Sequence, residues 1–166
     1  MTFKDRKKLC EKLNHDPKSV ARMAVMLSLQ PQWCKEILEL RKRVEVRKTA
    51  PAMERAFKVY LYCTKGKALY RSKFDDSVMN GKVIGEFVCD WVFDIPPLAA
   101  GEYHITEDDL KRTGLTKAQL WVYGRGEKLY GWEISELKRY TTPRDLADFG
   151  LTKAPQSWCY IGEIAP

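Results

Sequence analysis

Ligands for metals and partners for disulfide bonds are scarce in this sequence. Its 166 residues include only two histidines, and none of its five cysteines forms a CxxC pair. Zinc sites and disulfide frameworks need such residues at short, regular spacings. The spacing therefore argues against a structural zinc site and against a disulfide-stabilised extracellular fold. We predict no bound cofactor, and only the use of a divalent metal stays open.

Long apolar segments and common catalytic motifs are also missing. The uncharged stretch 23–34 is well short of the ~20 apolar residues that cross a bilayer. Residues 1–12 lack the apolar core of a signal peptide. We therefore expect a cytoplasmic protein without a membrane partner. No P-loop, GxGxxG, GxSxG or HExxH pattern occurs, so the standard nucleotide-binding, serine-hydrolase and metalloprotease sites are not indicated.

Positive charge is what the sequence has in excess. Lys and Arg number 29 against 22 Asp and Glu, which gives a formal net charge of +7. The basic residues gather in 1–22, 35–48 and 65–73. Nucleic acid is the commonest partner of such clusters, although a solvated surface also explains them. The stretch 65–73 has no acidic residue, and we expect its basic side chains to contact phosphates. These side chains are Lys65, Lys67, Arg71 and Lys73.

Hydrophobic patterning predicts an α+β fold. Apolar runs and polar–apolar alternation are typical of strands. The expected strands are 24–29, 42–48, 57–63, 82–93, 129–137 and 158–161, and residues 121–123 continue the β pattern. Helices are expected at 31–40 and 143–149, with a helical insertion at 94–120. Many strands and few helices favour a small mixed β-barrel decorated by short helices, over residues 23–166. Residues 1–22 are expected to form a basic, helical N-terminal extension.

The stretch 27–51, LSLQPQWCKEILELRKRVEVRKTAP, contains two distinctive motifs. The run Ser28-Leu29-Gln30-Pro31, followed by Trp33, resembles the strand-to-helix start of the ASCH family, within the PUA-like superfamily. Lys42-x-x-Glu45-x-Arg47 is similar to the GxKxxExR signature of that family. The segments 81–87, 130–134 and 157–160 resemble its later strands. The resemblance covers residues 24–163.

This resemblance implies a β-barrel with a cleft beside the first helix. Members of the family are associated with RNA and other nucleic acids. Some relatives cleave single-stranded RNA, and some hydrolyse the amide of N4-acetylcytidine. Leu40 stands where the family has a glycine, and because leucine disfavours positive φ we expect a less tight loop there. Glu45 stands where the amide-hydrolysing relatives have a nucleophilic threonine, so their mechanism does not transfer directly.

The signature residues are the candidate catalytic and phosphate-binding groups. We expect Lys42 at the mouth of the cleft, where it would hold a phosphate or, with a lowered pKa, act as a base. Glu45 and Arg47 share a strand face, which suits Arg47 to a phosphate or base edge and Glu45 to a base amine. Lys42 and Glu45 are the catalytic candidates if both reach one substrate proton. The alternatives are a solvated lysine and a structural Glu45–Arg47 ion pair.

Aromatic and polar side chains complete the candidate binding site. An unpaired base stacks on an accessible ring, whereas most buried rings only pack the core. The candidate rings are Trp33, Tyr130, Trp132, Trp158 and Tyr160, and we expect Trp33 and Trp132 to face the cleft. The other binding candidates are Ser28, Gln30, Pro31 and Ser157. The hydroxyl of Ser28 also fits a role in a turn.

Three functions remain open from the sequence. The first is a domain that holds RNA, another single-stranded nucleic acid or a modified nucleotide in the cleft. The second is a hydrolase, either a single-stranded ribonuclease or an amidohydrolase of a modified nucleoside such as N4-acetylcytidine. The third is a protein-interaction module whose contact surface is the insertion 94–120.

Overall fold

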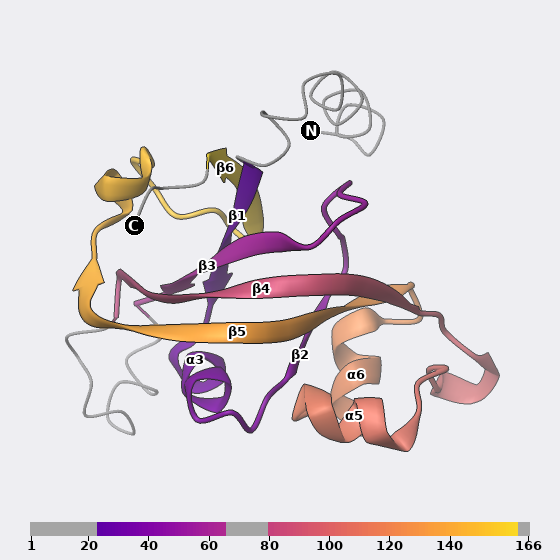
Figure 1. Ribbon diagram of the computed structural model, residues 1–166. Coiled ribbons are helices and arrows are strands. Elements are labelled where there is room, and N and C mark those ends of the chain that lie inside the picture. Colours follow the sequence, from indigo (N-terminus) through magenta and orange to yellow (C-terminus); the bar gives the residue numbers. More distant parts are fainter. Residues whose placement is uncertain (1–22, 66–79, 163–166) are drawn as a thin grey trace.

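The computed structural model describes residues 23–65 and 80–162. The expected extension 1–22 and three of the expected phosphate contacts, Lys67, Arg71 and Lys73, lie outside the described residues. Within them, the strands form one sheet in the order β2-β5-β4-β3-β1-β6 (Figure 1). The strands are β1 (Met23–Leu29), β2 (Val44–Arg47), β3 (Phe57–Cys63), β4 (Lys82–Ile95), β5 (Leu129–Arg144) and β6 (Trp158–Gly162). The helices are α3 (Pro31–Leu38), α5 (Glu107–Thr113) and α6 (Lys117–Gly124), with 3₁₀ turns η1 (Ala99–Gly101) and η2 (Leu146–Phe149).

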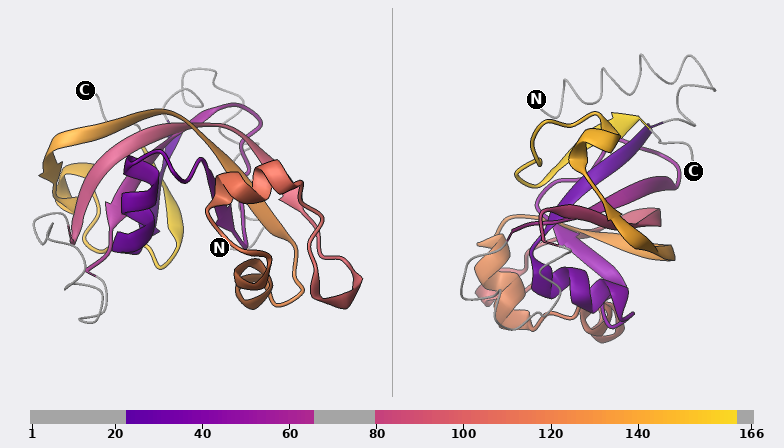
Figure 2. Two further views of the ribbon diagram at one scale, coloured as in Figure 1. Left: turned by 90° about the horizontal axis from the view of Figure 1, so that it is seen from below. Right: turned by 90° about the vertical axis from the view of Figure 1, so that its left-hand side faces the viewer.

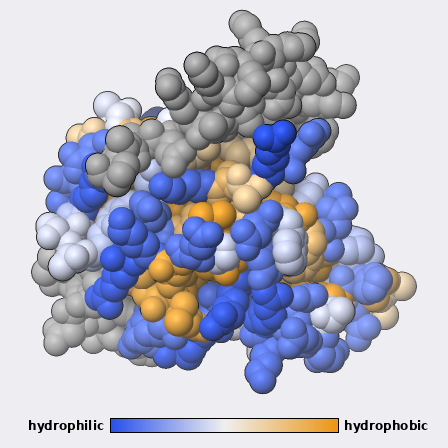
Figure 3. All heavy atoms as spheres, viewed as in Figure 1, coloured by the Kyte–Doolittle hydropathy of each residue, from blue (hydrophilic) through white to orange (hydrophobic). Residues whose placement is uncertain are grey.

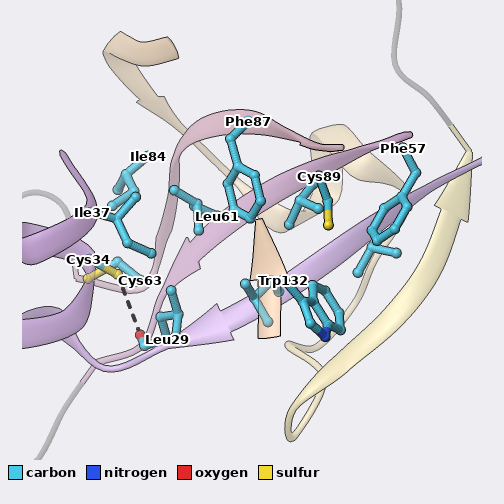
Figure 4. Close-up of a cluster of buried hydrophobic side chains, with 13 residues drawn as sticks. Leu29, Cys34, Ile37, Phe57, Leu61, Cys63, Ile84, Phe87, Cys89 and Trp132 are labelled. Atoms are coloured by element: carbon cyan, nitrogen blue, oxygen red, sulfur yellow. Dashed lines mark hydrogen bonds between the residues drawn. The ribbon is translucent and has the colours of Figure 1, made fainter. Parts of the chain in front are cut away.

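Strand alternation gives the sheet an apolar core on each face. In β1, alternate residues from Val25 to Leu29 join one core, and Ala24 and Met26 join the other. The strand is buried because it lies inside the sheet, parallel to β3 and antiparallel to β6. Helix α3 covers the first core and contributes Ile37 to it (Figure 4). On the outside, hydrophilic side chains cover most of the face in Figure 3, with apolar side chains gathered near its middle.

The sheet is curved, but it is not closed. Register shifts interrupt the pairing of β3 with β4 and of β4 with β5, and such bulges bend strands (Figure 2). The edge strands β2 and β6 have no backbone pairing with each other among the described residues. Side chains connect the β2 edge to β1 and β6 instead. Arg47 Nη2 donates to the carbonyl of Ser28 at 2.8 Å, and Trp158 Nε1 donates to Thr49 Oγ1 at 2.9 Å. The expected β-barrel is therefore confirmed only as a small mixed α+β fold with an open sheet.

The helical insertion extends further than the sequence predicts. Residues 121–123, predicted as strand, form the second half of α6. A capping box between Thr116 and Gln119 starts this helix, and Arg125, with φ of 52°, ends it. The strand prediction is wrong because the cap outweighs the β propensity of Trp-Val-Tyr. Strand β5 likewise runs on to Arg144, so only 146–149 of the expected helix at 143–149 are helical. None of the described helices is both long and apolar enough to cross a membrane.

The turn between α3 and β2 is tight, contrary to the expectation from Leu40. Leu40 has φ of 60°, in the left-handed region that costs an L-residue about 1–2 kcal/mol. The backbone N–H groups of Arg41 and Lys42 both donate to the carbonyl of Glu36, at 2.9 and 3.0 Å. These bonds satisfy the end of α3 and hold the strained residue in place. The turn therefore brings Lys42 back beneath α3.

Candidate functional site

A pocket of about 450 Å³ lies where α3, β2 and α6 come together. In Figure 1, α3 and α6 lie on either side of β2. The ends of β1 and β3 and the loop before β6 complete the wall. The lining residues are Ser28, Leu29, Gln30, Trp33, Lys42, Glu45, Val46, Arg47, Thr64, Leu115, Gln119, Tyr123 and Gln156. The pocket thus contains the signature residues Lys42, Glu45 and Arg47. It also contains Ser28, Gln30 and Trp33, and its position matches the cleft expected beside the first helix.

Lys42 lies inside the pocket wall and not at the mouth. The residue is only 3% exposed, because the Leu40 turn folds it under α3. Its Nζ donates to the carbonyl of Thr113 at 2.6 Å and lies 3.3 Å from Glu45 Oε2. Burial lowers the pKa of Lys42, while Glu45 opposes that shift. The expectation of a lysine at the cleft mouth is therefore wrong, and the buried amine is held by one carboxylate and one carbonyl.

Arg47 connects the pocket to the open edge of the sheet. Its Nε lies 3.0 Å from Glu45 Oε1, so Glu45 sits between two cations. Its Nη1 donates to Ser157 Oγ at 3.3 Å, in addition to the bond from Nη2 to the Ser28 carbonyl. The guanidinium therefore forms the structural pair with Glu45 that the sequence left open. Since two cations face one carboxylate, the charged residues of the pocket carry a net positive charge.

Two aromatic rings face the pocket from opposite helices. Trp33 of α3 lies over the Lys42 ammonium, with Nζ 5.2 Å from the ring centroid. Tyr123 of α6 lines the other side and lies beneath Lys48, whose Nζ is 5.3 Å from its ring centroid. Burial raises the pKa of Tyr123, and Arg47 opposes that shift, so the hydroxyl is neutral near neutral pH. These two rings are the aromatic side chains among the residues that line the pocket.

Trp132, expected at the cleft, lies in the core instead. The residue is fully buried, and its ring centroid lies 5.8 Å from that of Phe57 (Figure 4). The Trp158 ring packs against it at the same centroid distance of 5.8 Å. It pairs directly with Glu45, so the two side chains lie on the same face of the sheet, but Trp132 is part of the hydrophobic core and does not line the pocket. The expectation fails because alternation along a strand shows which face a residue lies on, and not where on that face the core ends and the pocket begins. Trp158 and Tyr160 also pack against this core and do not line the pocket.

The remaining candidates lie around the pocket or away from it. The Ser28 hydroxyl donates to the carbonyl of Pro155 at 2.7 Å, which ties the loop before β6 to β1. Pro31 is buried as the first residue of α3. Ser157 lies outside the lining, but its Oγ accepts from Arg47 and its carbonyl accepts from the Ser28 N–H at 2.9 Å. Tyr130 has Lys128 Nζ 4.7 Å from its ring centroid and does not line the pocket. Lys65 is exposed and also lies outside the lining.

Sequence reasoning missed the wall that α6 contributes. Gln119 and Tyr123 are one helical turn apart and so lie on one face of α6. The capping signal Thr116-x-x-Gln119 could have indicated the helix, but Trp-Val-Tyr favoured a strand. Thr64 and Gln156 are the other missed polar residues. They follow β3 and precede β6, and only the order of strands in the sheet brings them to the pocket.

Metal ligands and activated thiols are not gathered at the pocket. Among residues 23–65 and 80–162, no three His, Cys, Asp or Glu side chains lie close enough to hold a metal ion. Cys34 is buried beside Trp33 on α3, and its Sγ donates to the carbonyl of Leu29 at 3.7 Å. Burial raises the pKa of the Cys34 thiol well above its ordinary value. This thiol therefore stays protonated and is a poor nucleophile.

Comparison with known proteins identifies the fold. No protein-family model matches the chain, and no curated protein matches it. A crystal structure of ASCH from Zymomonas mobilis is similar at 19% sequence identity with a TM-score of 0.60, covering 83% of this chain and 87% of that chain. The chain has the ASCH fold. Two mutant structures of the same Zymomonas mobilis protein are similar at 20% identity, with TM-scores of 0.58 and 0.57. They cover 83% and 85% of this chain and 89% of each of those chains. At this identity the ASCH likeness establishes the architecture, and the ligand has to be argued from the pocket.

Proposed function

We propose that this ASCH-fold protein binds single-stranded nucleic acid, RNA in first place, by taking one unstacked base into the pocket. The observation that carries the proposal is the presence of two aromatic rings, Trp33 and Tyr123, in the lining of one pocket together with the net positive charge of Lys42, Glu45 and Arg47. Proteins that read single-stranded RNA stack bases on aromatic rings and attract the backbone with positive charge. The RNA association of the ASCH family and the net charge of +7 point the same way.

The size and polarity of the pocket suit a base. A volume of about 450 Å³ lies within the roughly 300–1,000 Å³ range of small-ligand sites. The side-chain amides of Gln30, Gln119 and Gln156 line it. Each amide offers both a donor and an acceptor, which is what the edge of a base presents. The pocket therefore supplies stacking and hydrogen bonding together, as sites for extruded bases do.

Lys42, Glu45 and Arg47 determine the shape of the pocket and its positive electrostatic potential. Arg47 and Lys42 hold Glu45 from both sides, so none of the three is free to rotate toward solvent. An ammonium has three N–H groups, and the described residues provide Lys42 with two oxygen partners, Thr113 O and Glu45. We assign the third N–H to a carbonyl oxygen or ring nitrogen of the bound base. Phosphate binding by Lys42, expected from the sequence, gives way to this role because the amine is buried.

The direct test is binding of fluorescein-labelled RNA of about eight nucleotides, followed by fluorescence anisotropy. DNA of the same sequence and an RNA duplex are measured in parallel. Base–aromatic stacking contributes about 1–3 kcal/mol, so Trp33→Ala should weaken binding roughly 5- to 150-fold. The matched control is Trp91→Ala, because Trp91 is 59% exposed and lies outside the pocket lining. Equal affinities for Trp33→Ala and the wild type, or no binding of any of the three nucleic acids, would contradict the proposal.

Hydrolysis is a second candidate function, favoured by one observation. Lys42 is a buried amine with a lowered pKa, 3.3 Å from the Glu45 carboxylate in a ligand-sized pocket. Such a pair can move a proton between a water molecule and a leaving group. Intact RNA after long incubation, together with unchanged N4-acetylcytidine on chromatography, would exclude both hydrolase activities. If either substrate is consumed, activity should be lost in Lys42→Met and partly kept in Tyr123→Phe, which preserves the ring.

A further inference from the structure

A second depression adjoins the pocket on its α6 side. Its lining residues are Lys48, Ala118, Gln119, Val122, Tyr123 and Arg125. Gln119 and Tyr123 belong to both sites, so one turn of α6 forms the wall between them. A ligand that fills the pocket and continues past Tyr123 therefore enters this depression.

The depression holds two cations that no carboxylate neutralises. Lys48 and Arg125 are both exposed, and neither has a carboxylate partner among the described residues. Two other exposed cations near the insertion, by contrast, are paired with carboxylates. Lys117 lies 2.7 Å from Glu107, and Lys128 lies 3.0 Å from Asp94. A cation already paired in this way gains little from a phosphate, whereas an unpaired one gains the full charge-assisted contact.

The positions of the two cations are fixed by the backbone of the pocket itself. Lys48 directly follows Arg47 at the end of β2, and its ammonium lies over the Tyr123 ring. Arg125 ends α6, where its N–H donates to the carbonyl of Trp121 at 2.8 Å. Its φ of 52° lies in the left-handed region. The elements that present the two charges are therefore the ones that build the base pocket.

We infer that this depression is a phosphate subsite, in which Lys48 and Arg125 hold the backbone phosphate adjacent to the base in the pocket. The inference rests on the proposed function, since the phosphate belongs to the strand whose base the pocket takes. It places a phosphate contact at the junction of β2 and α6, in addition to those predicted for the stretch 65–73. It also gives the strand a path, from the pocket past Tyr123 and across the end of α6.

Salt dependence tests this subsite directly. For single strands, each neutralised phosphate contributes about 0.7 to the slope of log K against log salt. The variant Lys48→Ala/Arg125→Gly removes both contacts, and glycine accepts the positive φ of Arg125 without strain. Because the two side chains hold one phosphate, its slope for an RNA of about eight nucleotides should be shallower than that of the wild type by about 0.7. DNA of the same sequence should show the same change, because the phosphates are the same.

The control variant removes the same charge elsewhere. Lys138→Ala/Lys153→Ala changes two exposed lysines that line neither site and lack a carboxylate partner among the described residues. Its slope should match that of the wild type. A phosphate-free nucleoside should bind the wild type and the Lys48→Ala/Arg125→Gly variant equally. An unchanged slope in that variant, or an equal loss in the control, overturns the subsite while the base pocket stands. A wild type that binds no nucleic acid and no nucleoside overturns the proposed function as well.

Discussion

Arg41 and Lys42 are neighbours in the chain, yet they lie in opposite environments. The Arg41 side chain is 51% exposed and pairs with Glu36, 2.7 Å away, and with Glu39 at the end of α3. The Lys42 side chain is 2% exposed and pairs with Glu45 inside the pocket. The turn at the left-handed Leu40 precedes both residues and leads the chain from the exposed end of α3 to the buried Lys42. Both residues thus form an ion pair with a glutamate. The pair of Arg41 is exposed to water, whereas the pair of Lys42 lies in the protein interior.

The difference shows what a buried ion pair contributes. In water, an ion pair is screened and holds flexible side chains at an entropic cost, so it stabilises little. In the interior, desolvation offsets most of the attraction, and the pair is worth little more than apolar residues of the same shape. Removing one partner of a buried pair is nevertheless strongly destabilising, because the other charge is then left buried without a counter-charge. The Lys42–Glu45–Arg47 arrangement is therefore better explained by the ligand site it forms than by stability.

The largest expected effect comes from removing the shared carboxylate. Glu45→Gln leaves Lys42 and Arg47 buried without a counter-charge, so the free energy of unfolding should fall by about 3–5 kcal/mol. Lys42→Met should cost less, because Arg47 still neutralises Glu45. Urea unfolding of the two variants and the wild type measures both values. A loss for Lys42→Met as large as that for Glu45→Gln would show that Glu45 is not the shared partner.

A substitution at Leu40, in the turn between α3 and β2, should increase the free energy of unfolding. Leu40→Gly removes the cost of a positive φ, and since Leu40 is 54% exposed little apolar burial is lost. We expect a gain of up to about 1 kcal/mol, the strain relieved less the greater backbone entropy of glycine when unfolded. Leu40→Ala keeps the strain and serves as the control. A thermal melt in which both variants are equally destabilised would mean that the leucine side chain, and not its backbone, matters here.

Titration should separate the buried cation from the exposed one. The folded-state pKa of Lys42 lies below its ordinary value of 10.5, so the folded state binds fewer protons than the unfolded state in that interval. Stability therefore rises with pH as the pH increases from the folded pKa toward 10.5. Lys42→Met lacks this contribution, so the difference in unfolding free energy between wild type and variant should shift in favour of the wild type. A difference that stays constant, or shifts the other way, would show that burial does not dominate at Lys42.

The smallest effect is expected at the exposed pair. Arg41→Ala removes a guanidinium that water already solvates, so no measurable change in unfolding free energy should follow. The comparison is made in the same urea experiment, at low and at moderate salt. A destabilisation that persists at moderate salt would place the Arg41 cluster among the structural interactions and weaken the contrast with Lys42.

The sequence predicts which residues share a face of a strand better than it predicts which side chains are buried or line the pocket. Alternation correctly placed Glu45 and Arg47 on one face of a strand, and the ion pair between them was one of two stated alternatives. Burial of Lys42 was missed because it depends on the positive φ of Leu40, which its residue type argues against. The Tyr123 wall was missed because a capping box turned a β-prone stretch into helix. The core position of Trp132 depends on where on the sheet face the core ends and the pocket begins, which no local pattern encodes.

The claim that the pocket takes a base is tested most directly at Trp33. The protein has five tryptophans, and labelling with 5-fluorotryptophan gives each its own ¹⁹F resonance, with Trp33 assigned from Trp33→Phe. Single-stranded RNA of about eight nucleotides is then titrated into the labelled protein. The Trp33 resonance should move progressively, while those of buried Trp132 and of exposed Trp91 outside the pocket should stay in place. Binding that leaves Trp33 unmoved, or that shifts Trp91 instead, would contradict the account.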